Sequence, residues 1–420
     1  MKFIQFAFAA LLICVLSCAA LAEKLPDLTL PAGVGVNIHF TTGHERDLNL
    51  IAAAGFKFVR MDFVWEEIER KKGSYDWSNY DALTTELAQQ GLQPYYILDF
   101  SNPLYEKSVA WTNPVTHKVE GPVTASPQHP ESVAVYARWA AASAEHFRGR
   151  GVIWEIWNEP NISTFWKPHP DAAQYTTLAL AAAKAMRAAD PQACIVGPAT
   201  SHFDWNFLEA FLKSGALEYF DAVSVHPYPD APDGSPAAPE TVAKDFARLR
   251  ELIKQYAPAG KTIPILSGEW GYATVDGISL ETQAGYIARM QLSNLLNGVP
   301  LSIWYDWKND GTDPAYNEDN FGTVANDLTP KPAYLAIQTL TRELSGYRIA
   351  RRHDTGNAED FVLVLTNAAG ATKLAAWTIG QPHNVMFDSK LKLELDAMPK
   401  YVSMGKARLP VFSVPGFAQH

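Results

Sequence analysis

At 420 residues, 47% hydrophobic and 19% charged, the chain has the composition of a folded globular protein, which excludes intrinsic disorder, coiled coils and collagen-like repeats. The length exceeds one ordinary domain of about 150 residues and suits one large α/β barrel with a small second domain. A formal net charge of -10 argues against nucleic acid or an anionic membrane as the partner, because binding phosphate requires a basic surface.

Residues 1–22 have the features of a secretory signal peptide. A lysine precedes a short apolar run, and Ala20-Leu21-Ala22 has the small-x-small pattern of a cleavage site. The run is too short to span a membrane, and no other segment approaches the ~20 apolar residues that a spanning helix requires. We therefore expect an exported protein, periplasmic or extracellular. The alternative is a lipoprotein anchored through Cys18, because Val15-Leu16-Ser17-Cys18 loosely matches a lipobox.

From Gly33 onward, short apolar runs alternate with longer stretches rich in Ala, Leu and Glu, which is the pattern of repeated βα units. The runs number eight: 34–40, 56–62, 94–100, 152–158, 194–197, 222–226, 263–268 and 301–306. Apolar residues recur at three- and four-residue spacing between several of them, which predicts helices, for instance over 132–147, 172–189, 242–256 and 280–296. Eight such units predict a closed (β/α)8 TIM barrel over residues 23–344.

Three long loops, 101–130, 227–239 and 307–332, follow predicted strands at their C-terminal ends, where barrel enzymes build their sites. Beyond residue 344 the pattern changes to the alternation of half-buried strands. We therefore predict an α/β protein with a small C-terminal all-β domain over residues 345–420.

Two glutamates stand at the C-terminal ends of predicted strands. Glu159 follows the fourth strand and Glu269 ends the seventh. These strands lie roughly across a closed eight-stranded barrel from each other, so both carboxylates can face one cavity. Cleaving a glycosidic bond requires such a pair, one protonated to assist the leaving oxygen and one ionised to meet the oxocarbenium-like centre. Glu155, within the fourth strand, is a rival carboxylate.

Three motifs together resemble the retaining glycoside hydrolases of clan A. They are Trp157-Asn158-Glu159-Pro160-Asn161 followed by Phe165-Trp166, then His226-Pro227-Tyr228, then Gly268-Glu269-Trp270. The chain looks most like glycoside hydrolase family 39, which includes β-xylosidases and Psl-type biofilm exopolysaccharide endoglycosidases, with family 5 a near relative. The resemblance implies that Glu159 is the acid/base and Glu269 the nucleophile. It also implies that Asn158 holds the sugar 2-hydroxyl, while Arg60 sits behind the nucleophile and Tyr228 hydrogen-bonds to it.

These roles agree with elementary electrostatics. A nucleophile must stay ionised, and a cation such as Arg60 with a donor such as Tyr228 would keep the pKa of Glu269 low. An acid must be protonated, which partial burial beside Trp157 and the negative charge of Glu269 would favour for Glu159. Under these assignments the two carboxyl groups should lie about 5 to 5.5 Å apart, and the anomeric configuration should be retained.

Tryptophan gathers at the same strand ends, where six of the 12 in the chain fall. An indole ring packs well on the C–H face of a sugar, so we expect Trp166, Trp270 and Trp304 to bind substrate, with Trp304 as the stacking platform at the cleaved sugar. His39 and His226 are expected to hydrogen-bond to substrate, because the chain lacks the paired histidine spacing of metal sites.

No metal or cofactor is expected. The acidic run 309–320 lacks the spacing of a calcium loop and is predicted to be a solvated lid. Together these features predict a secreted, monomeric retaining glycosidase that cleaves β-linkages of a neutral or cationic polysaccharide. Endo action is favoured because the long loops could wall a cleft for several sugars. The alternatives are an exo-acting β-xylosidase and a non-catalytic carbohydrate-binding barrel.

Overall fold

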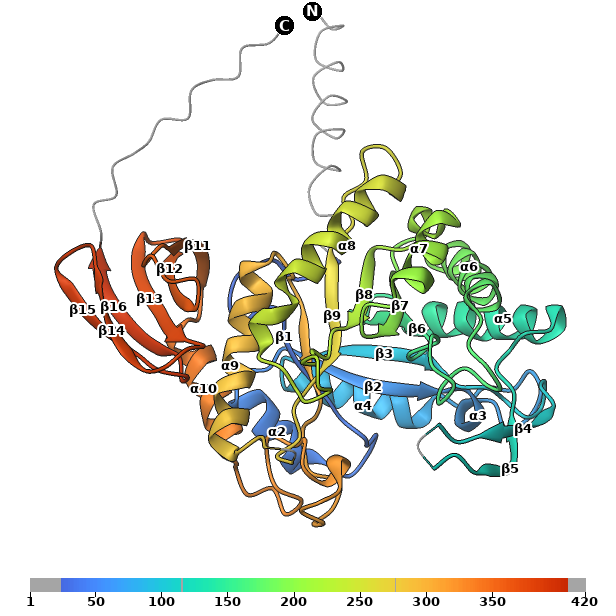
Figure 1. The fold of residues 1–420 in the computed structure, drawn as a ribbon. Helices are drawn as coiled ribbons and strands as arrows, with labels where there is room; N and C mark the ends of the chain where they lie inside the picture. Colours follow the sequence, from blue (N-terminus) through green and yellow to red (C-terminus); the bar gives the residue numbers. More distant parts are fainter. Residues whose placement is uncertain (1–23, 115, 276, 407–420) are drawn as a thin grey trace, which may run out of the picture.

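The computed structural model describes residues 24–114, 116–275 and 277–406 (Figure 1). The predicted signal segment 1–22, with Cys18, lies outside them. Among the described residues, no helix combines the length and apolar character that crossing a membrane requires. The chain forms a barrel of strands surrounded by helices, with further antiparallel sheets on one side, next to α9 (Leu280–Leu296) and α10 (Pro332–Glu343).

The barrel is closed and its eight strands are parallel, in the order β1-β10-β9-β8-β7-β6-β3-β2. The strands are β1 (Val34–Asn37), β2 (Phe58–Val64), β3 (Gln93–Asp99), β6 (Ile153–Ile156), β7 (Cys194–Ser201), β8 (Ala222–His226), β9 (Ile265–Trp270) and β10 (Ser302–Trp304). Each of the eight predicted runs overlaps one of them, so the predicted TIM barrel is confirmed.

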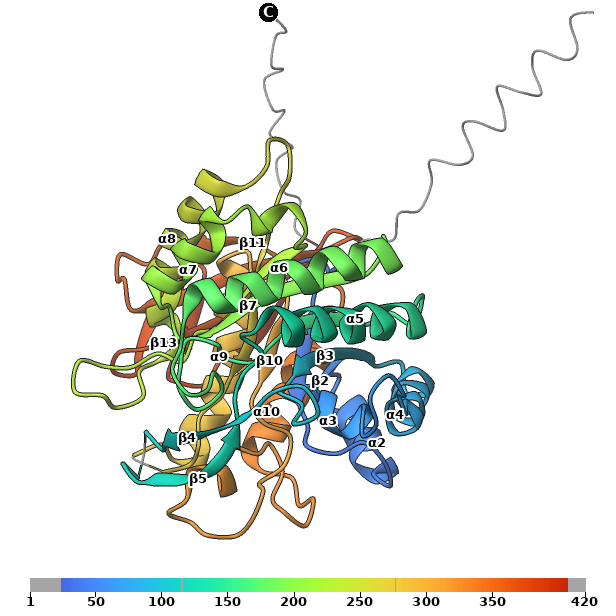
Figure 2. The same ribbon diagram turned by 90° about the vertical axis from the view of Figure 1, so that its right-hand side faces the viewer.

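Helices follow most of the strands and cover the outside of the barrel (Figure 2). Besides α9 and α10 they are α2 (Glu45–Ala53), α3 (Trp65–Ile68), α4 (Ser78–Gln89), α5 (Pro130–His146), α6 (Ala172–Ala189), α7 (Trp205–Lys213) and α8 (Ala243–Tyr256), with short 3-10 turns η1 (Ala216–Glu218), η2 (Pro239–Val242) and η3 (Asn317–Asp319). The start of α6 illustrates why predicted bounds can be accurate: the Asp171 side chain accepts bonds from the amides of Ala173 and Gln174, which have no partner within the helix.

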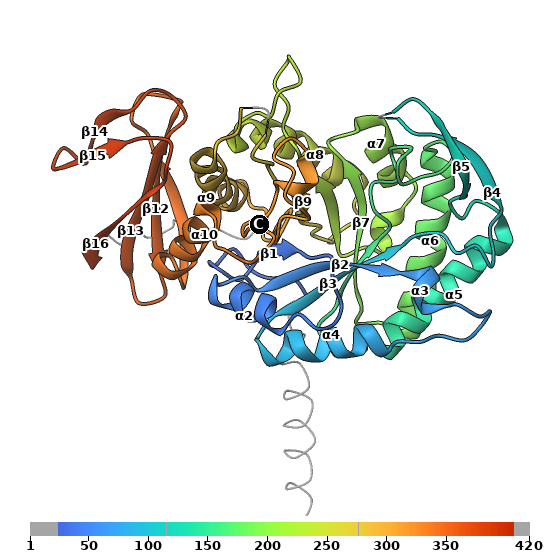
Figure 3. The same ribbon diagram turned by 90° about the horizontal axis from the view of Figure 1, so that it is seen from below.

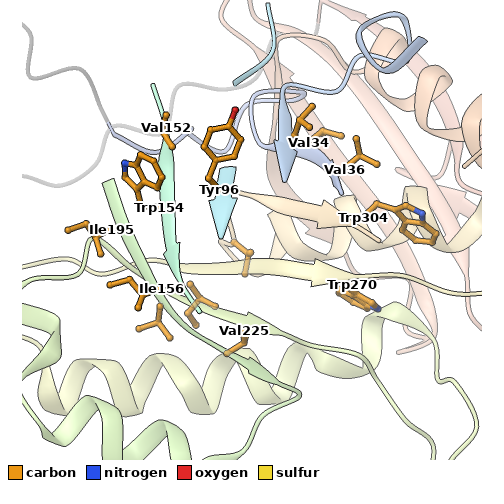
Figure 4. Close-up of a cluster of buried hydrophobic side chains, with 14 of the residues drawn as sticks. Val34, Val36, Tyr96, Val152, Trp154, Ile156, Ile195, Val225, Trp270 and Trp304 are labelled. Carbon is orange, nitrogen blue, oxygen red and sulfur yellow. The ribbon is translucent and has the colours of Figure 1, made fainter. Parts of the chain in front are cut away.

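Side-chain alternation along the strands divides the core into two parts. On β6, Ile153 belongs to the small apolar cluster inside the barrel, whereas Trp154 and Ile156 belong to the larger cluster between strands and helices. Figure 4 shows part of the larger cluster, including Trp154, Ile156, Trp270 and Trp304. Glu155 has the inward parity of Ile153 and is completely buried.

As far as residue 406, where the described residues end, all the strands of the C-terminal region pair antiparallel, as predicted. A four-stranded sheet has the order β11-β12-β13-β16, and β14 pairs with β15. The strands are β11 (Tyr347–His353), β12 (Asp360–Asn367), β13 (Ala371–Thr378), β14 (His383–Phe387), β15 (Leu391–Leu395) and β16 (Lys400–Lys406). At the opposite side of the barrel, the loop 101–130 contains an unpredicted hairpin, β4 (Ser108–Thr112) with β5 (Val119–Thr124) (Figure 3).

A buried polar contact joins the C-terminal sheet to the barrel. The indole of Trp377 on β13 donates to Glu240 Oε1 on η2 over 2.7 Å. Arg289 on α9 donates to both oxygens of the same carboxylate, over 2.8 and 2.7 Å. All three residues are buried, so the Glu240 carboxylate is fixed from both sides of the junction.

Trp377→Phe is expected to cost about 1 to 2 kcal/mol of unfolding free energy, because it removes a hydrogen bond to a buried carboxylate and little apolar area. Trp139→Phe is the matched control, since Trp139 is equally buried and its indole nitrogen has no hydrogen-bond partner among the described residues. Urea unfolding of both variants measures the difference. Equal losses would show that the contact with Glu240 contributes nothing.

Candidate active site

A cavity of about 370 Å³ opens at the C-terminal ends of the barrel strands. Six residues singled out from the sequence line it: His39, Arg60, Asn158, Glu159, Tyr228 and Glu269. They come from β1, β2, β6, β8 and β9 or the loops that follow, so the closed barrel brings together positions far apart in the chain. Active sites of TIM barrels are built at this end.

Glu269 is held by two donors. The Tyr228 hydroxyl donates to Oε1 over 2.7 Å, and Arg60 Nη1 donates to Oε2. Burial alone would raise the pKa of Glu269, but the charges of Arg60 and His226 and these two hydrogen bonds outweigh it and leave the pKa below its usual range. Glu269 is therefore ionised at neutral pH.

Arg60 donates hydrogen bonds to four residues of the site. Its side chain is 1% exposed. Besides Glu269, it donates through Nε and Nη2 to Glu155 Oε2, over 3.1 and 2.9 Å. Nη1 also bonds Asn37 Oδ1 and Nη2 bonds Asn158 Oδ1, over 3.1 and 2.8 Å. These bonds fix both amides, so the amide nitrogen of Asn158 points away from Arg60.

The rival carboxylate Glu155 does not line the cavity. It lies beneath the cavity, where Tyr95 and Ser224 donate to Oε1 and Arg60 occupies Oε2. Burial would raise the pKa of Glu155, but Arg60, His226 and Ser224 lower it to about 2. Glu155 is thus a permanent counter-ion to Arg60.

The ion pair makes stability depend on pH. The pKa of Glu155 is lower in the folded protein than its usual 4.5, so its contribution is complete above pH 4.5 and is lost as the pH falls towards 2. Between pH 4.5 and pH 2, we expect the free energy of unfolding of wild type to fall by about 3 kcal/mol relative to that of Glu155→Gln. Urea unfolding at several pH values tests this, with the exposed Glu67→Gln as control. A constant difference between wild type and Glu155→Gln would contradict it.

Glu159 follows β6 on a turn in which its own φ is +42°. Its amide donates to the carbonyl of Ala199 over 3.0 Å, which ties the turn to β7. His226 Nδ1 lies 3.0 Å from Glu159 Oε1. One oxygen of Glu159 and one of Glu269 lie within 4.8 Å of each other and of a His226 nitrogen. The two carboxylates thus face each other across a gap that one anomeric carbon can fill.

The structure corrects the expectation that His226 binds substrate. The side chain is completely buried beneath the cavity, between Glu159 and Arg60 Nη2, which lies 3.3 Å from Nε2. Burial would lower the pKa of His226, but the charge of Glu269 and hydrogen bonds with Glu155 and Glu159 raise it to about 9. His226 therefore positions Glu159.

The prediction that three tryptophans form the sugar-binding surface is also corrected. Trp166, Trp270 and Trp304 are fully buried and do not line the cavity. Trp270 and Trp304 end β9 and β10 on the outer face, among the side chains that pack against helices (Figure 4). Their neighbours Glu269 and Tyr305 reach the cavity instead. On β10 strand alternation is the reason, because Ile303 and Tyr305 point inward and Trp304 between them points outward. On β9 the inward side changes from Leu266 to Glu269 across an irregularity in the β9–β10 register, which leaves Trp270 outside.

Sequence reasoning assigned no substrate-binding role to the phenylalanines and Tyr305 that form the aromatic walls of the cavity, although Phe165 belongs to the first clan A motif. Phe100 stacks on Phe165 with ring centroids 5.7 Å apart, and Tyr305 meets Phe321 edge to face at 5.2 Å. Asp62 and Glu318 are the missed acidic residues of the lining. Asp62 could have been found, because it lies two residues after Arg60 and shares its face of β2.

Two clusters place potential metal ligands within 4.8 Å of one another in the described part of the chain. One is Glu159, His226 and Glu269; the other is His39, Asp306 and Asp310 beside the acidic loop 309–320. Burial would lower the pKa of His39, but its hydrogen bond to Asp310 and the charge of Asp306 raise it to about 9. A protonated His39 can pair with these carboxylates as a cation.

Comparison with known proteins assigns the part of the chain that carries this site to a family. The family model for cellulase (glycosyl hydrolase family 5) matches residues 32–311, which include the barrel strands and the cavity. The chain belongs to this family. Two β-xylosidases are similar in sequence: one of Caldicellulosiruptor saccharolyticus, 24% identical over 325 residues, and one of Geobacillus stearothermophilus, 25% identical over 286 residues. The matches cover 70% and 61% of this chain but 64% and 56% of those proteins.

Solved structures show the same fold. A family 39 glycoside hydrolase from Bacteroides cellulosilyticus WH2 superposes with a TM-score of 0.73 at 23% identity, covering 90% of this chain and 81% of that one. A family 39 β-xylosidase from Caulobacter crescentus gives 0.62 at 21% identity, covering 87% and 82%. The barrel with its C-terminal sheet is thus a fold that this chain shares with family 39 enzymes.

Proposed function

We propose that this protein is an exported retaining glycosidase that cleaves β-linkages of a polysaccharide by double displacement. The observation that carries the proposal is the Glu159–Glu269 pair, with oxygens within 4.8 Å and a pKa of Glu269 held below its usual range. Retaining glycosidases have carboxyl groups about 5 to 5.5 Å apart, whereas inverting enzymes leave about 6.5 to 9.5 Å for a water molecule.

In the first step, Glu269 attacks the anomeric carbon while Glu159 gives its proton to the leaving oxygen. The covalent bond neutralises Glu269 and leaves Glu159 ionised. In the second step, Glu159 takes a proton from a water molecule, whose oxygen attacks the same carbon and releases Glu269. Two inversions give net retention. His226 beside Glu159 stabilises the carboxylate that forms between the steps.

Endo action on a neutral or cationic extracellular or cell-wall glycan is our preferred assignment. The hairpin β4–β5 and the loops 227–239 and 307–332 follow the strands that carry the cavity, where they could bound a cleft for several sugars. The alternative is an exo-acting β-xylosidase, which the names of the two sequence relatives favour. Export is proposed from the signal-like segment 1–22, and the proposed oligomeric state is a monomer.

The deciding experiment offers purified protein a panel of β-linked oligosaccharides and follows the products by chromatography and the anomeric protons by NMR. We expect oligosaccharide products that first appear in the β-configuration. Release of monomers alone would rule out endo action, and α-products would rule out double displacement. No hydrolysis of any glycan would favour the non-catalytic binding protein.

A further inference from the structure

Two aspartates that the proposed chemistry does not use lie against each other at the wall of the cavity. Asp62 on β2 lines the cavity, and Asp99 ends β3. In the register of these strands Asp62 is paired with Ile97, so Asp99 lies two residues further along the same inward face. The two carboxyl groups are therefore neighbours on that face, close enough for each to shift the pKa of the other.

Asp99 has no other partner. Its side chain is completely buried, and neither oxygen receives a hydrogen bond from a donor group among the described residues. The two nearby hydroxyl groups donate to backbone carbonyls and not to Asp99. Tyr80 donates to the carbonyl of Asp62 over 2.8 Å, and Tyr136 donates to the carbonyl of Leu98. A buried carboxylate without donors is costly, so a proton must lie between the two groups.

The surrounding charges favour one shared proton. Burial, followed by the charge of Asp62, raises the pKa of Asp99 well above its usual range. Burial also raises the pKa of Asp62 against the opposing charges of Arg60 and His39. The ionisable groups that face the pair come from six elements or their ends: His39, Arg60, Tyr80, Tyr136, Glu155 and Glu269. These shifts favour a pair that holds one proton, on the more deeply buried Asp99, and one negative charge.

We propose that Asp62 binds a hydroxyl group of the sugar ring at the cleavage site, and that Asp99 positions Asp62 by sharing its proton. This inference rests on the proposed glycosidase function and adds a determinant of which sugar is accepted. A carboxyl pair with one proton can accept a hydrogen bond from a hydroxyl and donate one to it, which matches the two roles of a sugar hydroxyl. A cationic group would gain less, because Arg60 and His39 already face the pair.

The position of Asp62 selects the ring that is bound. Arg60, two residues earlier on the same face, contacts Glu269, which is the proposed nucleophile. Asp62 and Glu269 line one cavity and are close enough for the charge of Glu269 to raise the pKa of Asp62. The bound hydroxyl therefore belongs to the ring whose anomeric carbon is attacked, and it is distinct from the 2-hydroxyl expected at Asn158.

The test measures kcat and KM with 2,4-dinitrophenyl β-xyloside and β-glucoside and with their 3-, 4- and 6-deoxy analogues, where the sugar has that hydroxyl. Wild type is expected to lose about 100-fold in kcat/KM with one of the analogues, because a site built for a hydroxyl rejects a sugar without it. Asp62→Ala should lose about 100-fold with the full sugar and should no longer distinguish that analogue. The surface variant Glu67→Gln should behave as wild type.

Asp99→Asn separates positioning from mere packing. Its amide can donate to Asp62, so discrimination against the analogue should remain, and urea unfolding should show a protein at least as stable as wild type. In infrared difference spectra at neutral pH, wild type minus Asp99→Asn and wild type minus Asp62→Asn should each show the band of one buried protonated carboxyl group. The bands of other protonated carboxyl groups, such as Glu159 and Asp306, cancel in the difference.

The outcomes are distinguishable. If wild type and Asp62→Ala both hydrolyse the glycosides and distinguish the full sugar from its deoxy analogues equally well, this inference alone is overturned. Difference spectra without that band would overturn the shared proton. Failure of wild type to hydrolyse any of the glycosides would overturn the proposed function and the inference with it.

Discussion

Glu269→Ala is expected to lower kcat on aryl β-glycosides by about 10⁵-fold or more, because it removes the atom that forms the covalent intermediate. Glu159→Ala should behave differently. With an activated leaving group such as 2,4-dinitrophenolate, the first step needs little acid assistance, so the intermediate should accumulate and the second step should become limiting. Stopped-flow release of dinitrophenol should show a burst in Glu159→Ala only.

Azide distinguishes the two roles further. In Glu159→Ala, azide can enter the space left by the carboxylate and attack the intermediate without a general base, so turnover should rise and the product should be a β-glycosyl azide. In Glu269→Ala, azide attacks the substrate directly, and any product should be the α-azide. The β-azide from Glu269→Ala would reverse the assignment, and an unchanged rate in either variant would refute it.

Arg60→Met is expected to cost about 3 to 5 kcal/mol of unfolding free energy. The substitution leaves Glu155 charged and completely buried with its principal counter-ion gone. It also removes the cation that lowers the pKa of Glu269, so the acid limb of the kcat/KM profile should move to higher pH. Urea unfolding and the pH profile measure the two effects.

The double variant Arg60→Met/Glu155→Gln is the matched control. Neutralising Glu155 removes the unpaired buried charge, so part of the lost stability should return, whereas the shift of the acid limb should remain because Glu269 still lacks Arg60. Stability that does not recover would show that the loss comes from packing and not from charge.

Sequence periodicity predicted the barrel well because its elements are buried on defined faces. The helices α6 and α9 have the predicted bounds, and each predicted barrel strand exists. The end of β7 was set too early at 197, because Gly197-Pro198 is typical of a strand end. The structure accommodates Pro198 at an irregularity in the β7–β8 register. The hairpin β4–β5 is largely exposed and lacks apolar alternation, so periodicity gave no signal for it.

The site was predictable to the extent that it depends on motifs. Glu159, Glu269, Arg60 and Tyr228 line one cavity, as the resemblance to clan A implied. Which of two adjacent residues faces the cavity could not be read from sequence, because the sequence does not specify which side of each strand points inward. Trp304 therefore lies outside the barrel wall while Tyr305 reaches the cavity. The contact between Asp62 and Asp99 depends on the register of two strands, which the sequence does not specify.

The contact between Trp377 and Glu240 affects whether the barrel can be produced without the C-terminal sheet. The loop that begins after β8 carries Tyr228 and runs directly into η2, where Glu240 is held by the C-terminal sheet. The sheet thus anchors the far end of a segment whose near end contacts Glu269. A protein cut at residue 344 would keep all eight barrel strands and both glutamates, yet Glu240 would lose its hydrogen bond from Trp377 and keep only those from Arg289. The smallest unit that can be moved intact into another protein is therefore the barrel together with its sheet.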